Sequence, residues 1–427
     1  MSRKPARVTA APTPAPEPAR ILIAAHSHPA VSRGGAEIAA WRHHGAMREA
    51  GWQSWFMGAA REAATRAGSA ITQPFGPDQF LYTSTSFDWF KFANPDPNFP
   101  REFRAMLRDL RPDVVHFHHY AVFGVESFLH IRETLPECRI VLTLHEYQAI
   151  CNHYGQMVKR ERQELCHGAS LRECNRCFPE YSRADFFLRQ TYAQRFFALV
   201  DHFVSPSRFL ADRYIAWGLD PARVSVIENI IAAPTETATP ARPGARLRIG
   251  YFGQISSLKG IDVLLDAAAL LEADGNTAVQ IEVHGDHTNQ PAEFQARFTA
   301  RLAETGRNVR FHGPYGNEQV DRLMRGVEAV VVPSIWWENA PVVIQECLRN
   351  RRPVICSDIG GMAEKVRDGV DGLHFPVGDA VALADLLAEL ATDRTRLAEI
   401  GKTMRGPAGH DETLAEHLRL YAKLRGG

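Results

Sequence analysis

Residues 330–371 constrain the fold of this chain more than any other stretch. A β-branched run from Val330 to Val332 stops at a proline, as buried parallel strands do. Pro341 then stands where a first helical residue is expected, and a second strand follows over residues 353–356. Two strand–loop–helix units in succession place two loops at the carboxyl edge of one sheet, where open α/β sheets bind ligands.

Two glutamates in this stretch are candidate site residues. Glu338 stands in the loop, directly after two tryptophans, and Glu346 stands on the helix, so both could face one ligand. They could act as an acid/base pair, bind hydroxyl groups by accepting hydrogen bonds, or be ordinary surface carboxylates. The position of Glu338 at a strand's carboxyl edge favours a functional role.

The same strand–loop–helix pattern fills both halves of the chain. A strand over residues 20–25 leads through a glycine loop to a helix from Ala36, and residues 246–252 restart the pattern. With 427 residues, the chain is too long for one ordinary core. We therefore predict an α/β protein with two Rossmann-like, doubly wound domains that face a cleft.

Composition predicts the boundaries between these units. Residues 1–18 are rich in Ala and Pro and lack an apolar signal core, which predicts a disordered leader. The other expected units are a first domain over 19–231, a linker over 232–245, a second domain over 246–405 and a final helix within 406–427 that has no strand after it.

Charge and hydropathy exclude several classes of function. Lysine plus arginine equals aspartate plus glutamate, at 49 each, so no net charge points to nucleic acid or anionic lipid. No apolar run approaches the roughly 20 residues that a membrane-spanning helix needs. We expect a cytoplasmic protein, in which seven cysteines do not form a disulfide framework.

Two further segments carry weaker signals. An aromatic helix over residues 184–200, with Arg183, Arg189 and Arg195, could lie peripherally at the inner face of the plasma membrane. The simpler interpretation is a core-packing helix with a solvated basic edge. Residues 70–100 show no clear period, and we predict loop and short helix there.

Four cysteines lie in a short polar insert, residues 151–182, with the spacing C-x14-C-x7-C-x2-C. This pattern suits tetrahedral zinc; an iron–sulfur cluster or four reduced thiols are the alternatives. An irregular insert of this size lacks a core of its own, which favours a structural metal without a catalytic role. The candidate ligands are Cys151, Cys166, Cys174 and Cys177.

Three short loops are ambiguous when each is taken alone. Lys259 ends a glycine loop at a helix start, which suits a phosphate but also an ordinary solvated lysine. The pair Gly34 and Gly35 could admit a ligand or form a plain turn. The histidines that follow a strand could bind a metal, but more simply line the acceptor side of the cleft; they are His116, His118 and His119.

Taken together, these segments resemble the retaining glycosyltransferases of family 4, which have the GT-B fold. The resemblance covers the chain from about Arg20, and its most specific part is the EX7E segment from Glu338 to Glu346 with the PVICSDIGGMAEKVRDGVDGLHF that follows. Supporting motifs, in order, are SRGGAE at 32–37, HE at 145–146, SPS at 205–207 and LKG at 258–260. The cysteine insert places the chain in a distinct subgroup.

The resemblance implies roles for individual residues. Glu346 would bind the ribose hydroxyls of a nucleotide sugar, Glu338 would lie by the donor sugar, and His145 would lie near the reaction centre. Lys259 would hold the diphosphate, and Gly35 would let the first-domain loop approach it. The other donor-binding candidates are Gly34, Gly253, Gln254, Gly285, Asn339, Ala340 and Val342.

The resemblance also implies an activity. A sugar would move from a nucleotide-diphosphate donor to a saccharide or lipid-linked acceptor, with retention and without a cofactor, in surface polysaccharide or glycan biosynthesis. The final helix would cross back to the first domain. Gln254 stands where many members carry arginine, and Arg33 is a candidate replacement. The alternatives are a GT-B epimerase-like enzyme and a non-catalytic, metal-stapled scaffold.

Overall fold

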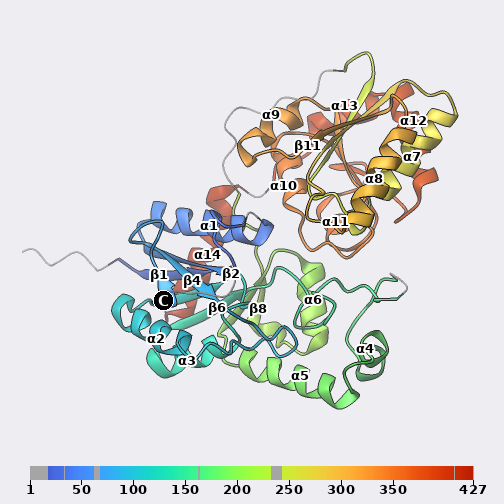
Figure 1. Cartoon of the computed structure of the whole chain (residues 1–427). Helices are drawn as coiled ribbons and strands as arrows, with labels where there is room; N and C mark the ends of the chain where they lie inside the picture. The colour runs from blue at the N-terminus through green and yellow to red at the C-terminus, as the bar shows by residue number, and fades with distance from the viewer. Residues whose placement is uncertain are drawn as a thin grey trace, which may run out of the picture.

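The computed structural model describes residues 18–32, 34–61, 68–161, 164–231, 243–407 and 409–426. Within these residues the chain forms two α/β domains, one after the other in sequence (Figure 1). The predicted leader, apart from residue 18, and most of the predicted linker lie outside the described residues.

The first domain is built on a doubly wound sheet. Among the described residues its strand order is β3-β4-β2-β1-β5-β6-β7-β8, and every neighbouring pair is parallel except β3 and β4. Strand β1 (Arg20–Ala24) is buried at the centre, and the chain order reverses on its two sides. The other strands are β2 (Gln53–Arg61), β3 (Ile71–Thr72), β4 (Gln79–Ser84), β5 (Val114–Phe117), β6 (Arg139–Thr143), β7 (His202–Ser205) and β8 (Val224–Val226).

In three of the described first-domain helices, a serine side chain caps the first turn. The side chain of Ser207 accepts a hydrogen bond from the Leu210 amide at the start of α6, which ends at Gly218. Ser182 and Asp185 form a capping box at the start of α5. The helices are α1 (Gly35–Glu49), α2 (Phe99–Leu110), α3 (Glu126–Thr134), α4 (Leu171–Cys177), α5 (Arg183–Phe197) and α6 (Arg208–Trp217), with a 3-10 turn η1 (Pro221–Arg223).

The second domain has an all-parallel sheet in the described residues, in the order β11-β10-β9-β12-β13-β14. The chain order reverses between β9 and β12, so the carboxyl ends of these two strands mark the point where doubly wound sheets bind ligands. The strands are β9 (Leu247–Phe252), β10 (Val279–His284), β11 (Val309–Gly313), β12 (Ala329–Val332), β13 (Val354–Ser357) and β14 (Gly372–Phe375).

Helices pack on both faces of this second sheet, and two of them lie against the ligand edge. Helix α7 (Ile261–Ala273) follows the 3-10 turn η2 (Ser257–Lys259), and α10 (Val342–Arg349) follows the loop after β12. The remaining helices are α8 (Ala292–Glu304), η3 (Asn317–Gln319), α9 (Val320–Arg325), α11 (Gly360–Lys365), α12 (Ala380–Thr392) and α13 (Thr395–Thr403).

Helix α14 (His410–Leu424) returns from the second domain to the first, as predicted. Figure 1 shows it in red among the blue strands of the first domain. Leu420 and Tyr421 are buried in a cluster with Ile21 and Ile23 of β1. The first sheet is therefore covered on this face by residues from the opposite end of the sequence.

Two predictions about local structure are wrong. Residues 70–100 contain strands β3 and β4 as well as loop, and β2 occupies 53–61, where the sequence analysis identified no strand. Arg189, expected on a solvated edge of α5, is buried and donates to the backbone carbonyl oxygens of Gln148 and Ala149. No helix in the described residues is both long and apolar enough to cross a membrane.

Candidate active site

A cavity of about 820 Å³ lies between the two domains, at the carboxyl edges of both sheets. Every residue predicted from the resemblance to bind the donor or to lie near the reaction centre lines this cavity. From the first domain these are Gly34, Gly35 and His145. From the second domain they are Gly253, Gln254, Lys259, Gly285, Glu338, Asn339, Ala340, Val342 and Glu346.

Lys259 and Glu338 form an ion pair in the wall of the cavity. The Lys259 Nζ atom lies 2.6 Å from Glu338 Oε1, and the same oxygen accepts hydrogen bonds of 2.8 Å from Ser334 Oγ and Trp336 Nε1. Glu338 is only 6% exposed, so these three donors compensate the loss of water around its carboxylate. Lys259 is held beside this loop by Gly260, because a Cβ atom there would lie 1.8 Å from the Pro333 carbonyl oxygen.

Two helix N-termini meet across the cavity. Helix α1 begins at Gly35 and α10 begins at Val342; a Cβ atom added at Gly35 would lie 3.6 Å from the Val342 side chain. The free amides of both first turns give each end a partial positive charge. This convergence makes an anion-binding surface beside the Lys259 ammonium.

Asn339 links the loop before α10 to the first domain. Its Oδ1 atom accepts a hydrogen bond of 2.6 Å from Ser207 Oγ, and its Nδ2 atom donates to the His145 backbone oxygen at 3.4 Å. Gly361 lets a neighbouring helix approach this loop, because a Cβ atom there would lie 1.5 Å from the Asn339 carbonyl oxygen. The loop is therefore held from both domains at once.

Trp337, in the same loop, contacts the cysteine insert. Its Nε1 atom donates to the Cys166 carbonyl oxygen at 2.9 Å, and the ring packs against Phe209 and the Arg213 guanidinium of α6. The insert thus touches the residue next to Glu338, which places it at the rim of the cavity.

Glu346 faces the cavity from α10 and is 9% exposed. Burial raises the pKa of its carboxyl group to about 7, while Arg42 and Arg349 act in the opposite direction. Among the described residues, no hydrogen-bond donor lies within reach of this carboxylate. Its acceptor oxygens are therefore available to a ligand.

Arg42 is a cavity residue that the sequence analysis did not identify. It lies on α1 and faces Glu346 from the first domain, and burial lowers the pKa of its guanidinium. A signal for it exists in the sequence, because Gly35, Ile38 and Arg42 stand at helical i, i+3 and i+7 spacing, and all three line the cavity. Arg33, the predicted replacement for the missing arginine at position 254, lies outside the described residues.

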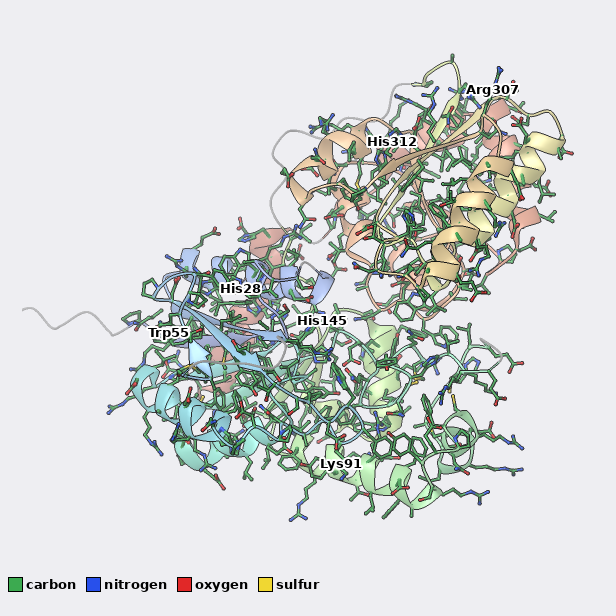
Figure 2. The ribbon with its side chains drawn as sticks, in the orientation of Figure 1. His28, Trp55, Lys91, His145, Arg307 and His312 are labelled. Carbon is green, nitrogen blue, oxygen red and sulfur yellow. The ribbon has the colours of Figure 1, made fainter. Side chains whose placement is uncertain are left out.

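His145 stands just after β6, at the edge of the first domain that faces the second (Figure 2). Its Nε2 atom lies 2.9 Å from His118 Nδ1. Burial lowers the pKa of His145 to about 3, with a smaller contribution from His26, so the ring is neutral at physiological pH. Nδ1 is the ring nitrogen left for a ligand in the cavity.

The expectation that three histidines line the acceptor side of the cleft is wrong for His116 and His118. Both are buried within the first domain, where each makes hydrogen bonds to other side chains of the fold. Neither lines the cavity. His119 is also buried and does not line the cavity, so the expectation is wrong for it as well; it accepts a hydrogen bond from the Ala121 amide.

The four cysteines of the insert are free thiols in one region of the structure. Burial raises the pKa of the Cys151 thiol to about 11, and the nearby Cys166 adds to this rise. Among the described residues, the one group of three His, Cys, Asp or Glu side chains with ligand atoms within 4.8 Å of one another is His43, His116 and His118. The sulfur atoms of the insert are thus neighbours without converging on one point.

Comparisons with known proteins agree with this architecture. The family described as Glycosyltransferase Family 4 matches residues 33–233, and the family described as Glycosyl transferases group 1 matches residues 234–406. The chain is a GT-B protein of the glycosyltransferase group 1 and family 4 type. Each of its two halves thus matches a family of glycosyltransferases.

Curated relatives of this GT-B chain include enzymes named for sugar transfer. It is 31% identical over 201 residues to the D-inositol 3-phosphate glycosyltransferase of Nocardia farcinica, and this match covers 43% of each chain. With the enzyme of the same name from Streptomyces bingchenggensis it shares 25% identity over 66% of this chain and 68% of that one. It is 30% identical over 152 residues to the alpha-D-kanosaminyltransferase of Streptomyces kanamyceticus, which is 35% of this chain and 38% of the relative. The first and third matches span less than half of the relatives' own length.

Solved structures share the fold over nearly the whole chain. Sucrose-phosphate synthase from Thermosynechococcus elongatus superposes with a TM-score of 0.69 at 17% identity, covering 95% of this chain and 99% of that one. The Anabaena protein HepE, solved in complex with UDP, superposes with a TM-score of 0.65 at 15% identity, covering 95% and 100%. These likenesses establish the GT-B fold.

Proposed function

We propose that this protein is a retaining glycosyltransferase that moves a sugar from a nucleoside-diphosphate donor to a saccharide or lipid-linked acceptor. The observation that carries the proposal is the Lys259–Glu338 ion pair in the wall of an interdomain cavity. The names of the relatives support transfer of a sugar, and the UDP bound in HepE supports a nucleotide donor for a chain of this fold.

The diphosphate of the donor is assigned to the anion-binding surface at the two helix N-termini. Breaking the bond between the anomeric carbon and the diphosphate places negative charge on the leaving group. Lys259 and the amides at the start of α10 stabilise that charge as it develops. Glu338 keeps its hydrogen bonds from Ser334 and Trp336 and accepts from a hydroxyl group of the sugar.

The nucleoside is assigned to the end of the cavity that contains Glu346. A carboxylate without a protein donor can accept two hydrogen bonds from a ribose diol. The loops after β10 and β11 contribute Asn289 and Tyr315 to the same wall, where the base would lie. Arg42 supplies a second cation from the first domain, which offsets the glutamine at position 254.

The acidic groups available argue against a double-displacement route to the proposed retention of configuration. A double-displacement route needs an ionised carboxylate on the face of the sugar opposite the leaving group. Glu146 is the first-domain carboxyl group that lines the cavity among the described residues, and burial raises its pKa to about 8, so it is mostly protonated at neutral pH. We therefore assign attack to the same face from which the diphosphate departs.

The acceptor is assigned to the first domain and is proposed to belong to surface polysaccharide or glycan biosynthesis. For a lipid-linked acceptor, α5 offers a contact with the membrane surface. Phe187 and Leu188 on this helix are 56% and 61% exposed and lie near Arg183.

The deciding experiment is a transfer assay with a panel of UDP-, GDP- and dTDP-sugars and with saccharide and lipid-linked acceptors. We expect release of one nucleoside diphosphate and a product with the anomeric configuration of the donor, read by proton NMR. An inverted product would contradict retention. An epimerised sugar without any acceptor would indicate the epimerase-like alternative, and no turnover with any donor would leave the scaffold alternative.

A further inference from the structure

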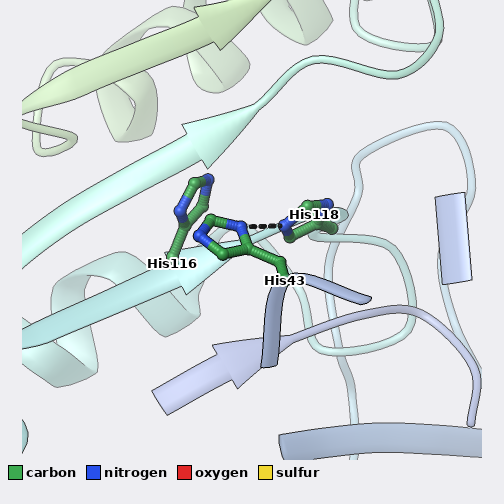
Figure 3. A group of neighbouring side chains, drawn as sticks. All are labelled: His43, His116 and His118. Atoms are coloured by element: carbon green, nitrogen blue, oxygen red, sulfur yellow. Dashed lines mark hydrogen bonds between the residues drawn. The ribbon is translucent and has the colours of Figure 1, made fainter. Parts of the chain in front are cut away.

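A continuous chain of hydrogen bonds runs from the cavity into the first domain. It starts at His145, whose Nε2 atom lies 2.9 Å from His118 Nδ1. His118 Nε2 in turn lies 3.0 Å from His43 Nδ1 (Figure 3). Because His43 stands on α1, the chain of bonds passes from the loop after β5 to the helix that begins at the cavity.

Tyr421 of α14 continues this chain. Its hydroxyl group lies 3.0 Å from His43 Nε2 and 2.6 Å from His116 Nδ1. The other ring nitrogen of His116, Nε2, lies 2.7 Å from Thr143 Oγ1 on β6. From His118 to Thr143, every member is 3% exposed or less. The chain of bonds is therefore sealed from water along most of its length.

A metal ion is the obvious alternative for three buried histidines. His43, His116 and His118 place ring nitrogens within 4.8 Å of one another. Figure 3 shows the three rings gathered together. The hydrogen bonds just described use both nitrogens of all three rings, which leaves no lone pair for a cation. Burial, together with neighbouring histidines, lowers the pKa of each ring well below 6.5, so all three are neutral.

Neutral rings impose a direction on the whole chain of bonds. A neutral imidazole has one N–H group and one lone pair, and a hydroxyl group between two rings donates to one and accepts from the other. The direction of donation in one hydrogen bond therefore determines the direction in the next. Two arrangements of the protons, one in each direction, satisfy the whole chain of bonds. In one of them His145 Nε2 accepts and Nδ1 carries the proton; in the other Nε2 donates and Nδ1 presents a lone pair.

We infer that His118, His43, Tyr421 and His116 are positioning residues that set the tautomer and ring orientation of His145 as one unit. The inference rests on the proposed function, in which His145 lies by the transferred sugar. One tautomer offers an N–H group to an oxygen of the donor, and the other offers an acceptor to a hydroxyl group. A mixture of both would place the wrong group at the reaction centre in part of the molecules.

Tyr421→Phe tests this inference, because it removes the hydroxyl that joins two rings and keeps the aromatic ring. The matched control is Tyr82→Phe, which removes an equally buried hydroxyl from hydrogen bonds to Asn94 and Asp96 that are not part of the chain. For Tyr421→Phe we expect kcat to fall about tenfold, less than the ~10²-fold typical of losing a positioned acid–base group outright. The KM for the donor stays within about twofold, because the diphosphate-binding residues are untouched.

A spectroscopic readout separates positioning from loss of stability. The full-length protein is labelled with ¹⁵N-histidine, the His145 signals are assigned with His145→Gln, and the ring nitrogen shifts report the tautomer. We expect the wild type and Tyr82→Phe to share one ratio of the two His145 tautomers, and Tyr421→Phe to give a different ratio. Thr143→Val removes the partner at the far end with little change in shape and should also change the ratio, even if Tyr421→Phe does not fold.

An identical ratio of the His145 tautomers in Thr143→Val and in the wild type would overturn the inference. So would one metal ion per wild-type chain that Tyr421→Phe loses. The tautomer measurement needs no substrate, so it is independent of the proposed function. A tautomer that responds to Thr143→Val in a protein without transferase activity would uphold the network and reject the function.

Discussion

The Lys259 ammonium and the Glu338 carboxylate lie 2.6 Å apart, although 79 residues separate them in sequence. Each stands at the carboxyl end of a strand beside the reversal of strand order in the second sheet, Lys259 after β9 and Glu338 after β12. The lysine is thus held by the residue proposed to bind the sugar. A donor that brings its own phosphates would therefore compete with Glu338 for this cation.

Lys259→Ala should abolish most donor turnover. Removing one preorganised charge that stabilises a leaving group costs about 10² to 10³ in rate. The measurement is kcat with the donor that the panel selects. Lys159→Ala is the control, because Lys159 forms an exposed ion pair with Glu164 at 3.6 Å, outside the cavity. Unchanged turnover in Lys259→Ala would reject this role for the lysine.

Donor affinity should depend on pH through Glu346. The pKa of this group is raised to about 7, so its acceptor form dominates above that pH and is lost below it. Between pH 8 and pH 6 the ionised fraction falls about tenfold, and the Kd for an intact nucleotide sugar should rise by a similar factor. Intact nucleotide sugar is the right probe, because its diphosphate lacks the terminal phosphate proton that titrates in this range.

Two variants check the origin of that pH dependence. Glu346→Gln should bind the donor weakly at every pH, with a flat profile, by titration calorimetry. Glu328→Gln should keep the profile, because Glu328 is an equally buried carboxylate of the second domain that pairs with Arg394 away from the cavity. If the Kd for the donor still depends on pH in Glu346→Gln, another group is responsible for the titration.

Arg42→Ala should move the midpoint of this profile to higher pH. Burial raises the pKa of Glu346, and Arg42 lowers it across the cavity. Without Arg42 the effect of burial is opposed less, so the pKa of Glu346 should rise. Arg48→Ala, on the same helix, removes an exposed partner of Asp78 and should leave the midpoint in place. A midpoint in Arg42→Ala that stays fixed or moves down would contradict the electrostatic coupling.

Glu364→Ala should loosen the contact between the domains. Its two carboxylate oxygens accept hydrogen bonds from the Arg208 and Phe209 amides, at 2.8 and 2.6 Å, so α11 of one domain caps α6 of the other. Losing such a cap costs about 1 kcal/mol. We expect faster hydrogen exchange at both amides and a larger radius of gyration in solution scattering. Glu293→Ala, in the first turn of α8, is the control.

The cysteine insert should bind one zinc ion per chain. Helix α4 has no buried residue, so apolar burial does not hold this helix in place, and a bound metal would. Elemental analysis of the purified protein gives the stoichiometry, and the double substitution of Cys174 and Cys177 by serine should remove the metal. Cys138→Ser is the control, since this thiol is buried in the core. A wild-type protein without zinc or iron would reject the prediction.

The central strands of both sheets were predictable because a buried parallel strand is apolar on both faces. The runs RILIA of β1 and AVVV of β12 have no other plausible place in a soluble fold. Strand β2, QSWFMGAAR, escaped detection because its buried run has no β-branched residue. Strand β4 escaped because most of its residues are only half-buried, as expected near the edge of a sheet.

The cavity was predictable to the extent that its residues stand at the ends of strands. Glu338, Lys259 and His145 follow strands, so the sheet topology alone brings them to one edge. Arg42 and Tyr421 stand on helices, where only the packing of those helices shows which side chains face the site. The buried hydrogen bonds of His116 could not be foreseen, because its partner Tyr421 is 305 residues away in sequence.

That separation has a consequence for synthesis of the protein on the ribosome. The first domain emerges complete in its strands, but the surface of β1 that Leu420 and Tyr421 cover stays open until α14 is translated. Val226, the last residue of β8, and Tyr421 are 195 residues apart, which at about 5 to 20 residues per second amounts to roughly 10 to 40 s of exposure. During this interval the nascent chain presents an apolar face to chaperones and proteases, so its yield in the cell depends on how fast the second half is made.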